Sequence, residues 1–343
     1  MPYFDASYPL AYEKGTKMDS LIFAINAVAP LIFLVALGYF LKRIGWVTLD
    51  NSKTLNRLVF HIFLPATLFL NIYKIESFGD IEFGYIIYAM AAVGVLYLLA
   101  VGAIVLFVPE RSRWGALLQS AFRSNYALVG IPLSGSLFGE EGIIAASLLS
   151  AVIVPSLNML AVISLTVFGD GKTTIKKVLV GIAKNPLIRA IFLGLVAIFI
   201  RSLFVKWGIS FRLSEVKSIY TTLTYMSNLS TPLALIALGA QFEFSTVTSM
   251  KKEILMGILM RTVLAPVLGI GVAYLFFRDA FTGAHFATFV AVFVTPVAVS
   301  SVPMTQEMKG DVVLMGQLVV WTTLLSSITI FVASFLLRLA GIF

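Results

Sequence analysis

Long runs of apolar residues, separated by short polar segments, set the pattern of this chain of 343 residues. About 20 apolar residues cross a bilayer as a helix, and the runs lack the alternation with a period of two that a barrel requires. Ten runs of this kind predict ten transmembrane helices, over 20–41, 55–73, 83–108, 114–138, 142–169, 186–205, 218–242, 254–277, 280–306 and 312–337. The pattern therefore predicts an all-α integral membrane protein in contact with the lipid bilayer.

The composition agrees with a membrane protein. Hydrophobic residues make up 59% of the chain and charged residues 12%, against roughly 25% charged residues in a soluble domain. So few charges cannot cover a surface in water, which excludes a soluble enzyme and a disordered tail. The chain has no cysteine and only two histidines, His61 and His285, far apart in sequence. A disulfide or thiolate metal site is thereby excluded, and we expect neither a cofactor nor a metal.

The charged residues indicate the membrane topology of the chain and the sign of the charge on its substrate. Lys and Arg exceed Asp and Glu, 25 against 17, for a net charge of +8. Most of the basic residues fall on the side reached after odd-numbered spans, which the positive-inside rule makes cytoplasmic, with both termini outside. Topology thus explains the excess without a nucleic-acid partner. The acidic residues lie in loops or at helix ends, so the predicted membrane centre suits an anion better than a cation.

Proline and glycine patterns recur in the same order in the two halves. They are Pro30 with Gly38 and Pro186 with Gly194, then Pro65 and Pro232, then Pro132 with Gly139-Glu140 and Pro303 with Gly310-Asp311. Each half holds five helices, so the halves must enter the membrane from opposite sides, as inverted repeats do. We predict an N-terminal extension (1–17), a first five-helix repeat (18–169), a cytoplasmic linker (170–185) and a second five-helix repeat (186–343).

The fourth and ninth spans are predicted to be broken near the middle of the membrane. Pro132 and Pro303 remove backbone donors, and Gly130 and the Ser300-Ser301 pair loosen the same turns. Broken helices in matching positions of two halves indicate a substrate site, and the N-terminal ends of the half-helices favour an anion. The candidate substrate-binding residues are Asn125, Gly130, Ile131, Pro132, Ser300, Ser301, Pro303, Thr305 and Gln306.

Several ionisable residues within or beside the spans have two interpretations. His61, one turn before Pro65, and Glu307 are candidates for proton or ion coupling, or else a structural histidine and a helix cap. Four arginines lie toward the cytoplasmic ends of spans and are expected to reach the interface, namely Arg57, Arg123, Arg189 and Arg261. Arg123 alternatively screens anions that enter from the cytoplasm. Asn158 and Gln317 would face the break or join helices.

Motifs along the chain resemble the auxin efflux carrier family, which includes plant PIN-type auxin carriers and bacterial carriers of malonate or malate. The motifs are Asn125 with Gly130-Ile131-Pro132 and Phe138-Gly139, Leu58-Val59-Phe60 with Leu64-Pro65, and Val302-Pro303. The resemblance implies a scaffold of spans one, two, six and seven, and a transport unit that holds crossing broken helices. It also implies elevator-type movement and a homodimer formed through the scaffold. The short linker favours a compact microbial type.

We therefore expect a secondary active transporter that moves a small organic anion, auxin-like or a dicarboxylate, across the plasma (inner) membrane. The alternative is a sodium-coupled organic anion symporter of the bile acid transporter type, with Glu307, Gln306 and Asn125 near the ion. A channel or receptor fits broken inverted repeats less well. An enzyme is not expected, because the chain lacks a membrane-placed HExxH, Walker or GxSxG motif. Substrate, direction and coupling stay open.

Overall fold

The computed structural model describes residues 17–74, 83–168 and 175–343, and within these ranges every regular element is a helix. The first half contains α1 (Lys17–Arg43), α2 (Leu49–Leu58), the π-helix η1 (Val59–Phe63), α3 (Leu64–Tyr73), α4 (Phe83–Phe107), η2 (Arg111–Arg113), α5 (Trp114–Phe122), the π-helix η3 (Tyr126–Gly130) and α6 (Ile131–Val167). The predicted N-terminal extension lies almost wholly outside the described residues.

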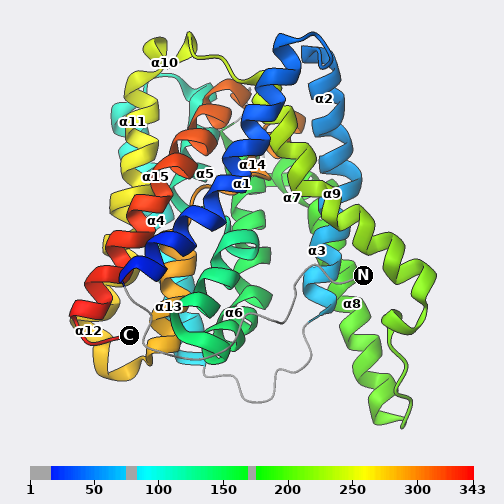
Figure 1. Ribbon diagram of the computed structural model, residues 1–343. Coiled ribbons are helices and arrows are strands. Elements are labelled where there is room, and N and C mark those ends of the chain that lie inside the picture. Colours follow the sequence, from blue (N-terminus) through cyan, green and yellow to red (C-terminus); the bar gives the residue numbers. More distant parts are fainter. Residues whose placement is uncertain (1–16, 75–82, 169–174) are drawn as a thin grey trace.

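The second half follows with α7 (Ile175–Lys184), α8 (Pro186–Lys206), η4 (Leu213–Glu215), α9 (Lys217–Gln241), α10 (Thr246–Ser249), α11 (Lys251–Leu259), the π-helices η5 (Met260–Leu264) and η6 (Val267–Gly271), α12 (Val272–Phe277), η7 (Arg278–Ala280), α13 (Gly283–Phe293), α14 (Ser301–Glu307) and α15 (Val312–Leu339). The predicted linker thus contains a helix, α7. Figure 1 shows the axes of most helices extending between the top and the bottom of the view, with α8 and the start of α9 extending from the main body.

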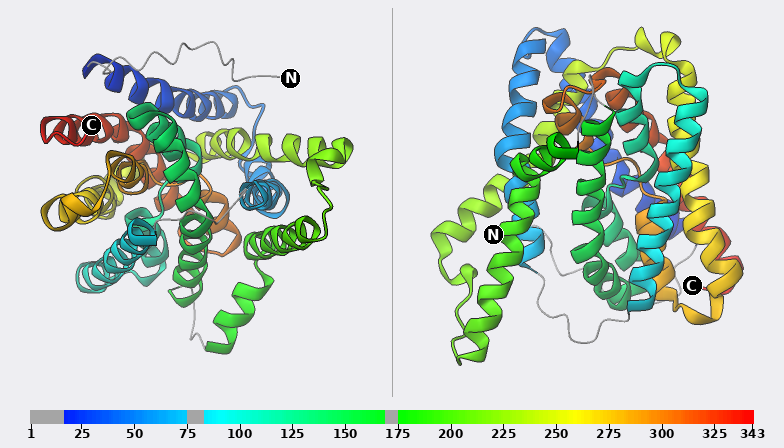
Figure 2. Two further views of the ribbon diagram at one scale, coloured as in Figure 1. Left: turned by 90° about the horizontal axis from the view of Figure 1, so that it is seen from below. Right: turned by 180° about the vertical axis from the view of Figure 1, so that it is seen from behind.

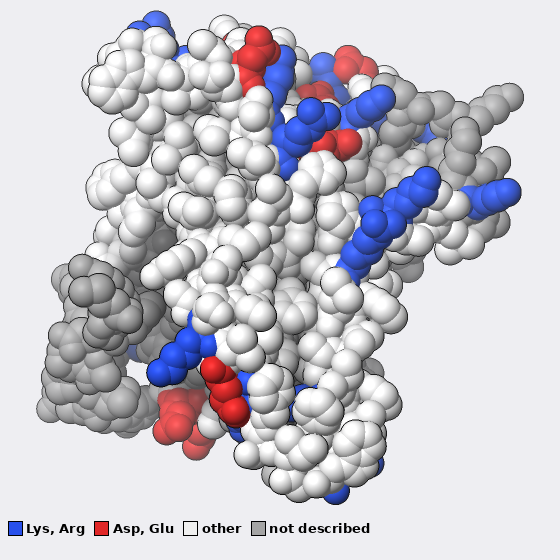
Figure 3. Space-filling model, turned by 90° about the vertical axis from the view of Figure 1, so that its right-hand side faces the viewer, with Lys and Arg blue, Asp and Glu red and all other residues white. Residues whose placement is uncertain are grey.

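Six continuous helical runs in the described ranges are long and apolar enough to cross a membrane. They are Leu49–Tyr73, Phe83–Phe107, Tyr126–Val167, Pro186–Lys206, Lys251–Ala280 and Val312–Leu339. Large apolar side chains such as Leu106 on α4 and Phe192 on α8 are exposed, as expected where helices meet lipid. The face in Figure 3 carries charged side chains toward its upper part and its lower edge, with a largely uncharged surface between them. An all-α membrane protein is supported, and the ten-helix inverted repeat stays a prediction.

The chain reverses inside α6, where the fourth predicted span meets the fifth. Phe138 leaves helical geometry (φ −140°, ψ 26°), and Gly139 has a positive φ of 61° with ψ −147°. Only glycine adopts that backbone conformation without strain. Gly142 lies directly against the Ser134 carbonyl on the preceding arm, so the two arms fold back on each other. The predicted boundary between these spans therefore has its physical basis in Gly139.

Two helix pairs approach closely at the glycines that the sequence repeats. A Cβ atom on Gly38 of α1 would collide with the Ile236 carbonyl of α9. A Cβ atom on Gly194 of α8 would lie 2.8 Å from the Ile72 Cβ of α3. In the view from below, α3, α8 and α9 lie on one side, and α4, α11, α12 and α15 on the other (Figure 2). Both close contacts join helices that resemblance to the carrier family assigns to the scaffold.

Candidate functional site

Two helices are interrupted at the middle of the molecule, and the interruptions pair with each other. The first break is Arg123-Ser124-Asn125, between α5 and η3, and the second runs over 294–300, between α13 and α14. The amide of Asn125 donates to the Pro296 carbonyl at 2.8 Å, and the amide of Ala298 donates to the Arg123 carbonyl at 3.0 Å. This antiparallel bridge satisfies buried backbone groups that the helices leave open.

The breaks lie upstream of the two prolines to which the sequence assigned them. Pro132 stands in the first turn of α6, and Pro303 lies inside α14. Pro132 follows directly on the π-helix η3 inside the continuous helical run Tyr126–Val167, so its missing N–H falls just after a π-helical turn. Pro296 lies within the second break, whereas the first break has no proline and is held by its pairing. Both helices are interrupted as predicted; the second break contains Ser300, which the sequence named, whereas the first begins at Arg123, well before Gly130 and Pro132.

A cavity of about 540 Å³ opens beside the breaks. On one side it is lined by residues of α1, α3, α8 and α9, and on the other by the two breaks, η3 and α6. Its polar lining residues are Thr67, Asn71, Arg123, Ser124, Asn125, Asn158, Ser227, Asn228, Ser230, Thr231 and Ser300. Small-molecule sites commonly have volumes of about 300–1,000 Å³, with apolar walls and a few convergent polar groups. The cavity therefore has the size and lining of a site for a small molecule.

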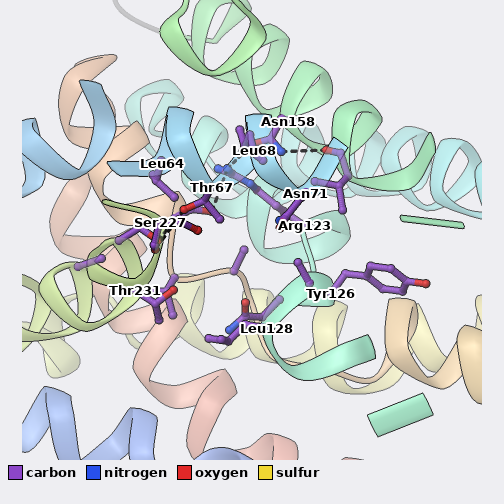
Figure 4. A pocket seen from close by; sticks show the side chains of 18 of the residues that line it. Leu64, Thr67, Leu68, Asn71, Arg123, Tyr126, Leu128, Asn158, Ser227 and Thr231 are labelled. Atoms are coloured by element: carbon purple, nitrogen blue, oxygen red, sulfur yellow. Dashed lines mark hydrogen bonds between the residues drawn. The ribbon is translucent and has the colours of Figure 1, made fainter. Parts of the chain in front are cut away.

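Arg123 is the charged residue among the described residues that line the cavity, and none of these is acidic. Its side chain is buried, with a relative exposure of 2%. One guanidinium nitrogen donates to Gln119 Oε1 at 2.7 Å, and the other donates to Asn158 Oδ1 at 2.8 Å and to Ser300 Oγ at 3.1 Å. Figure 4 shows Arg123 reaching toward Asn158 at the wall of the cavity. The charge is thus held by neutral acceptors, and it pairs with no carboxylate in the described ranges.

Two further polar atoms beside Arg123 are buried with no hydrogen-bond partner among the described residues. They are Asn125 Nδ2 and Ser124 Oγ, and both residues line the cavity. A buried donor without a partner costs about 1–3 kcal/mol. A bound group that accepts hydrogen bonds would supply the missing partners. Asn125 lines the cavity, and its bond to a substrate carboxylate stays a prediction.

The opposite wall of the cavity carries hydroxyl and amide groups from α3 and α9. Thr67 Oγ1 lies 3.0 Å from Ser230 Oγ, which joins the two helices beside Pro65 and Pro232. Asn71 is one helical turn beyond Thr67 and also lines the cavity. This wall was not among the residues predicted from the sequence. The signal was present as Thr67 and Asn71 at a spacing of four, and as the polar run from Ser227 to Thr231 before Pro232.

Of the substrate-binding candidates, the structure places Asn125 and Ser300 on the cavity. Ser301, Pro303 and Thr305 are buried in α14, and Thr305 Oγ1 accepts a hydrogen bond from Gln119 at 3.0 Å. The others outside the cavity lining are Gly130, Ile131, Pro132 and Gln306. Asn158 lines the cavity as one of its two interpretations expected, whereas Gln317 donates to the Glu243 carbonyl and Thr246 instead. Two of the nine candidates thus line the cavity, and the other seven lie outside its lining.

His61, Gln306 and Glu307 lie together at one end of α14, outside the cavity lining. His61 Nε2 lies 3.1 Å from Glu307 Oε2, and Arg57 Nε lies 3.9 Å from the same oxygen. Gln306 accepts a hydrogen bond from Asn56 Nδ2 at 3.0 Å and donates to the Lys53 carbonyl at 3.0 Å. These contacts fasten α14 to α2 and η1. Their role in ion coupling stays a prediction.

Arg261 lies on the far side of the same breaks, on η5. Arg57 and Arg189 are exposed, whereas Arg261 has a relative exposure of 1%. The expectation that Arg123 and Arg261 reach the membrane interface was therefore wrong. The positions of charges along one helix cannot show whether neighbouring helices supply hydrogen-bond acceptors that allow an arginine to be buried. For both arginines the acceptors lie at or beside the breaks.

Comparisons with known proteins support a transporter. A family described as "Membrane transport protein" matches residues 23–168 and 172–334. An uncharacterized transporter of Methanothermobacter thermautotrophicus is 24% identical over 315 residues, covering 89% of this chain and 95% of the relative. An uncharacterized transporter of Methanocaldococcus jannaschii is 29% identical over 222 residues, covering 63% of this chain and 68% of the relative.

Proposed function

This chain belongs to the membrane transport protein family, also called the auxin efflux carrier family, and we propose from that premise that it carries a small organic anion by secondary active transport. The proposed cargo is a carboxylate, either auxin-like or a dicarboxylate. The membrane is proposed to be the plasma (inner) membrane, with both termini outside. The family relationship establishes a multi-pass membrane transporter, and the cavity beside Arg123 supports the anion.

The buried charge of Arg123 is the observation that carries this proposal. A guanidinium removed from water without an opposite charge is costly, since neutral acceptors repay only part of its lost hydration. A carboxylate that enters the cavity would supply the missing charge through a charge-assisted hydrogen bond. Because the acidic residues of the described ranges lie outside the cavity lining, the site would attract an anion and repel a cation.

The surroundings of Arg123 define how such an anion would be held. Asn125 Nδ2 and Ser124 Oγ, both without partners in the described part of the chain, would bind the carboxylate oxygens. Apolar side chains, among them Leu64, Leu68 and Leu157, line the remaining wall and would contact the hydrocarbon part of the cargo. The carboxylate would then provide orientation, and the apolar wall would discriminate by shape.

The arrangement of the cavity also supports an elevator built from two inverted repeats. The lining is shared between α1, α3, α8 and α9, proposed as the scaffold, and the paired breaks with α6, proposed as part of the transport unit. The repeated glycines Gly38 and Gly194 each pack against a scaffold helix of the other half. Displacement of one group past the other would open the cavity alternately to each side of the membrane. A homodimer through the scaffold completes the proposal.

Transport in proteoliposomes tests the proposal. We expect uptake of labelled dicarboxylates or indole acids by the wild type, and its loss in Arg123→Gln, which keeps a polar side chain without the charge. Gln317→Ala is the matched control, because Gln317 is buried outside the cavity lining. The proposal fails if no anion from either class moves, or if Arg123→Gln transports as the wild type does. Imposed Na⁺ or proton gradients separate the sodium-coupled alternative from the others.

A further inference from the structure

Arg261 joins both interrupted helices through backbone carbonyls. Its Nε donates to the Thr295 carbonyl at 2.7 Å, inside the second break. Its two terminal nitrogens donate to the Val292 carbonyl at 2.7 Å and to the Ala121 carbonyl at 3.3 Å. Val292 lies in the last turn of α13 and Ala121 in the last turn of α5. One side chain therefore bonds to the ends of both half-helices and to the segment that follows one of them.

The charge of Arg261 complements these two helix ends. Each C-terminal end of a helix carries the equivalent of about −0.5 elementary charge, concentrated on carbonyls without helical partners. Two such ends meet at Arg261 and together offer about one negative charge to its single positive charge. Arg261 forms no ion pair with a carboxylate in the described ranges. Helix-end carbonyls are thus its counter-charge.

Carbonyls of this kind have another use in transporters. Where helices are discontinuous, unwound backbone carbonyls and the C-terminal ends of half-helices coordinate a coupling cation such as Na⁺. Here the planar guanidinium of Arg261, which cannot lose its proton at physiological pH, donates hydrogen bonds to three of these carbonyls at once. The π-helical turn of η5, where Arg261 lies, is a form of helix frequently found at functional sites.

We propose that Arg261 is a built-in cation of the paired breaks, a positioning residue that takes the place of a bound Na⁺. The carbonyls that would ligate Na⁺ at this point are occupied by the protein's own charge. The paired breaks are therefore held in every state of the carrier, with or without sodium. The expectation that transport needs no sodium ion at the breaks rests on the proposed function. The part of the inference that concerns stability does not.

Cation dependence of the purified protein tests the inference without any substrate. We expect the melting temperature of the wild type in detergent to be the same in NaCl, KCl and choline chloride of equal concentration. A shift specific to Na⁺ would overturn the proposal. In proteoliposomes that show anion uptake, replacing Na⁺ by choline should leave the rate unchanged. Uptake that required Na⁺ at the breaks would overturn this inference and leave anion transport intact.

Variants of Arg261 test the charge itself. We expect Arg261→Ala to lower the melting temperature, and millimolar guanidinium or methylguanidinium to restore part of that loss by occupying the vacated position. Gln317→Ala, also a truncation of a buried polar side chain, should gain nothing from these ions. Absence of any rescue specific to Arg261→Ala would count against a built-in cation.

If Arg261→Ala does not fold, Arg261→Lys and Arg261→Met replace it, because they differ in charge and are similar in length. The inference expects Arg261→Lys to be the more stable of the two, and below the wild type, since an ammonium lacks the planar fork that reaches three carbonyls. Equal stability of the two variants, or greater stability of Arg261→Met, would show that the charge is not needed.

Discussion

Arg123 and Arg261 lie at the same pair of helix breaks, and both are almost wholly buried. Arg123 is bonded to side chains, among them Gln119, Asn158 and Ser300, and it lines a cavity. Arg261 is bonded to backbone carbonyls that belong to helix ends, and it lies outside the cavity lining. Their partners, rather than their burial, therefore distinguish the two arginines: Arg123 borders the cavity proposed for an anion, and Arg261 holds the helix ends together.

The largest expected effect is on stability, from Arg261→Gln. This change would leave carbonyls unpaired at both helix ends, at about 1–3 kcal/mol each, so we expect a large fall in the melting temperature. Arg123→Gln should lower it less, because the side-chain partners of Arg123 can turn toward one another or toward water. Thermal unfolding of both variants in detergent measures the difference. The comparison breaks down if the two variants lose equal stability.

The next effect concerns the affinity for an anion. Arg123→Gln should weaken binding of a transported carboxylate about 10- to 100-fold, as expected from losing a hydrogen bond to a charged group worth about 1.5–3 kcal/mol. Titration calorimetry or a fluorescence titration with the purified protein measures it. Arg189→Gln, a change at an exposed arginine, serves as the control and should bind normally. Unchanged affinity in Arg123→Gln would show that Arg123 does not bind the anion.

Asn158→Asp tests the role of the Arg123 charge, because it replaces the side-chain NH₂ group of Asn158 with an oxygen. Its new carboxylate would lie where Asn158 Oδ1 now accepts from Arg123 at 2.8 Å, and would neutralise the charge that the cargo needs. We expect binding to fall at least several-fold while the melting temperature holds or rises. Asn158→Ala should reduce affinity less, by about 2- to 10-fold, because it removes one neutral acceptor. Tighter anion binding by Asn158→Asp would contradict an electrostatic role for Arg123.

The smallest expected effect is that of Gln306→Ala on binding. Although the sequence suggests Gln306 as a substrate ligand, its side chain bonds to Asn56, Gln241 and the Lys53 carbonyl instead. We expect the dissociation constant for the anion to stay within about twofold of the wild type, below 0.5 kcal/mol. Equilibrium binding on the purified variant measures this. A large loss of affinity would show that Gln306 contributes to anion binding.

An all-α chain with long apolar helices could be predicted from the sequence, because that signal is local. Apolar runs and the turn glycine Gly139 depend on neighbours within a few residues, and the predicted span 83–108 matches α4, Phe83–Phe107. The breaks were predicted as a pair, but the first was placed too far along the chain, because Pro132 and Gly130 were taken as its cause. The first break is instead held by hydrogen bonds to a segment about 170 residues away, which no local pattern contains.

The site was predicted in part for the same reason. Asn125 and Ser300 were found because they lie beside the breaks in sequence. Thr67, Asn71 and the polar turn of α9 were missed, since only the packing of α3 against α9 directs them to the cavity. Arg123 and Arg261 look alike in sequence, each within an apolar span. Their different partners come from helices distant in the chain.

The bridge between the two breaks has a consequence for how such a carrier can change its cargo. Its hydrogen bonds use main-chain atoms of Arg123, Asn125, Pro296 and Ala298, so the architecture asks little of the neighbouring side chains. Ser124, Ala298 and Val299 line the cavity with buried side chains, and exchanging these side chains would leave the main-chain donors and acceptors of the bridge in place. Under the proposed function, these positions are where the cargo would be changed while the atoms that pair the two breaks stay the same.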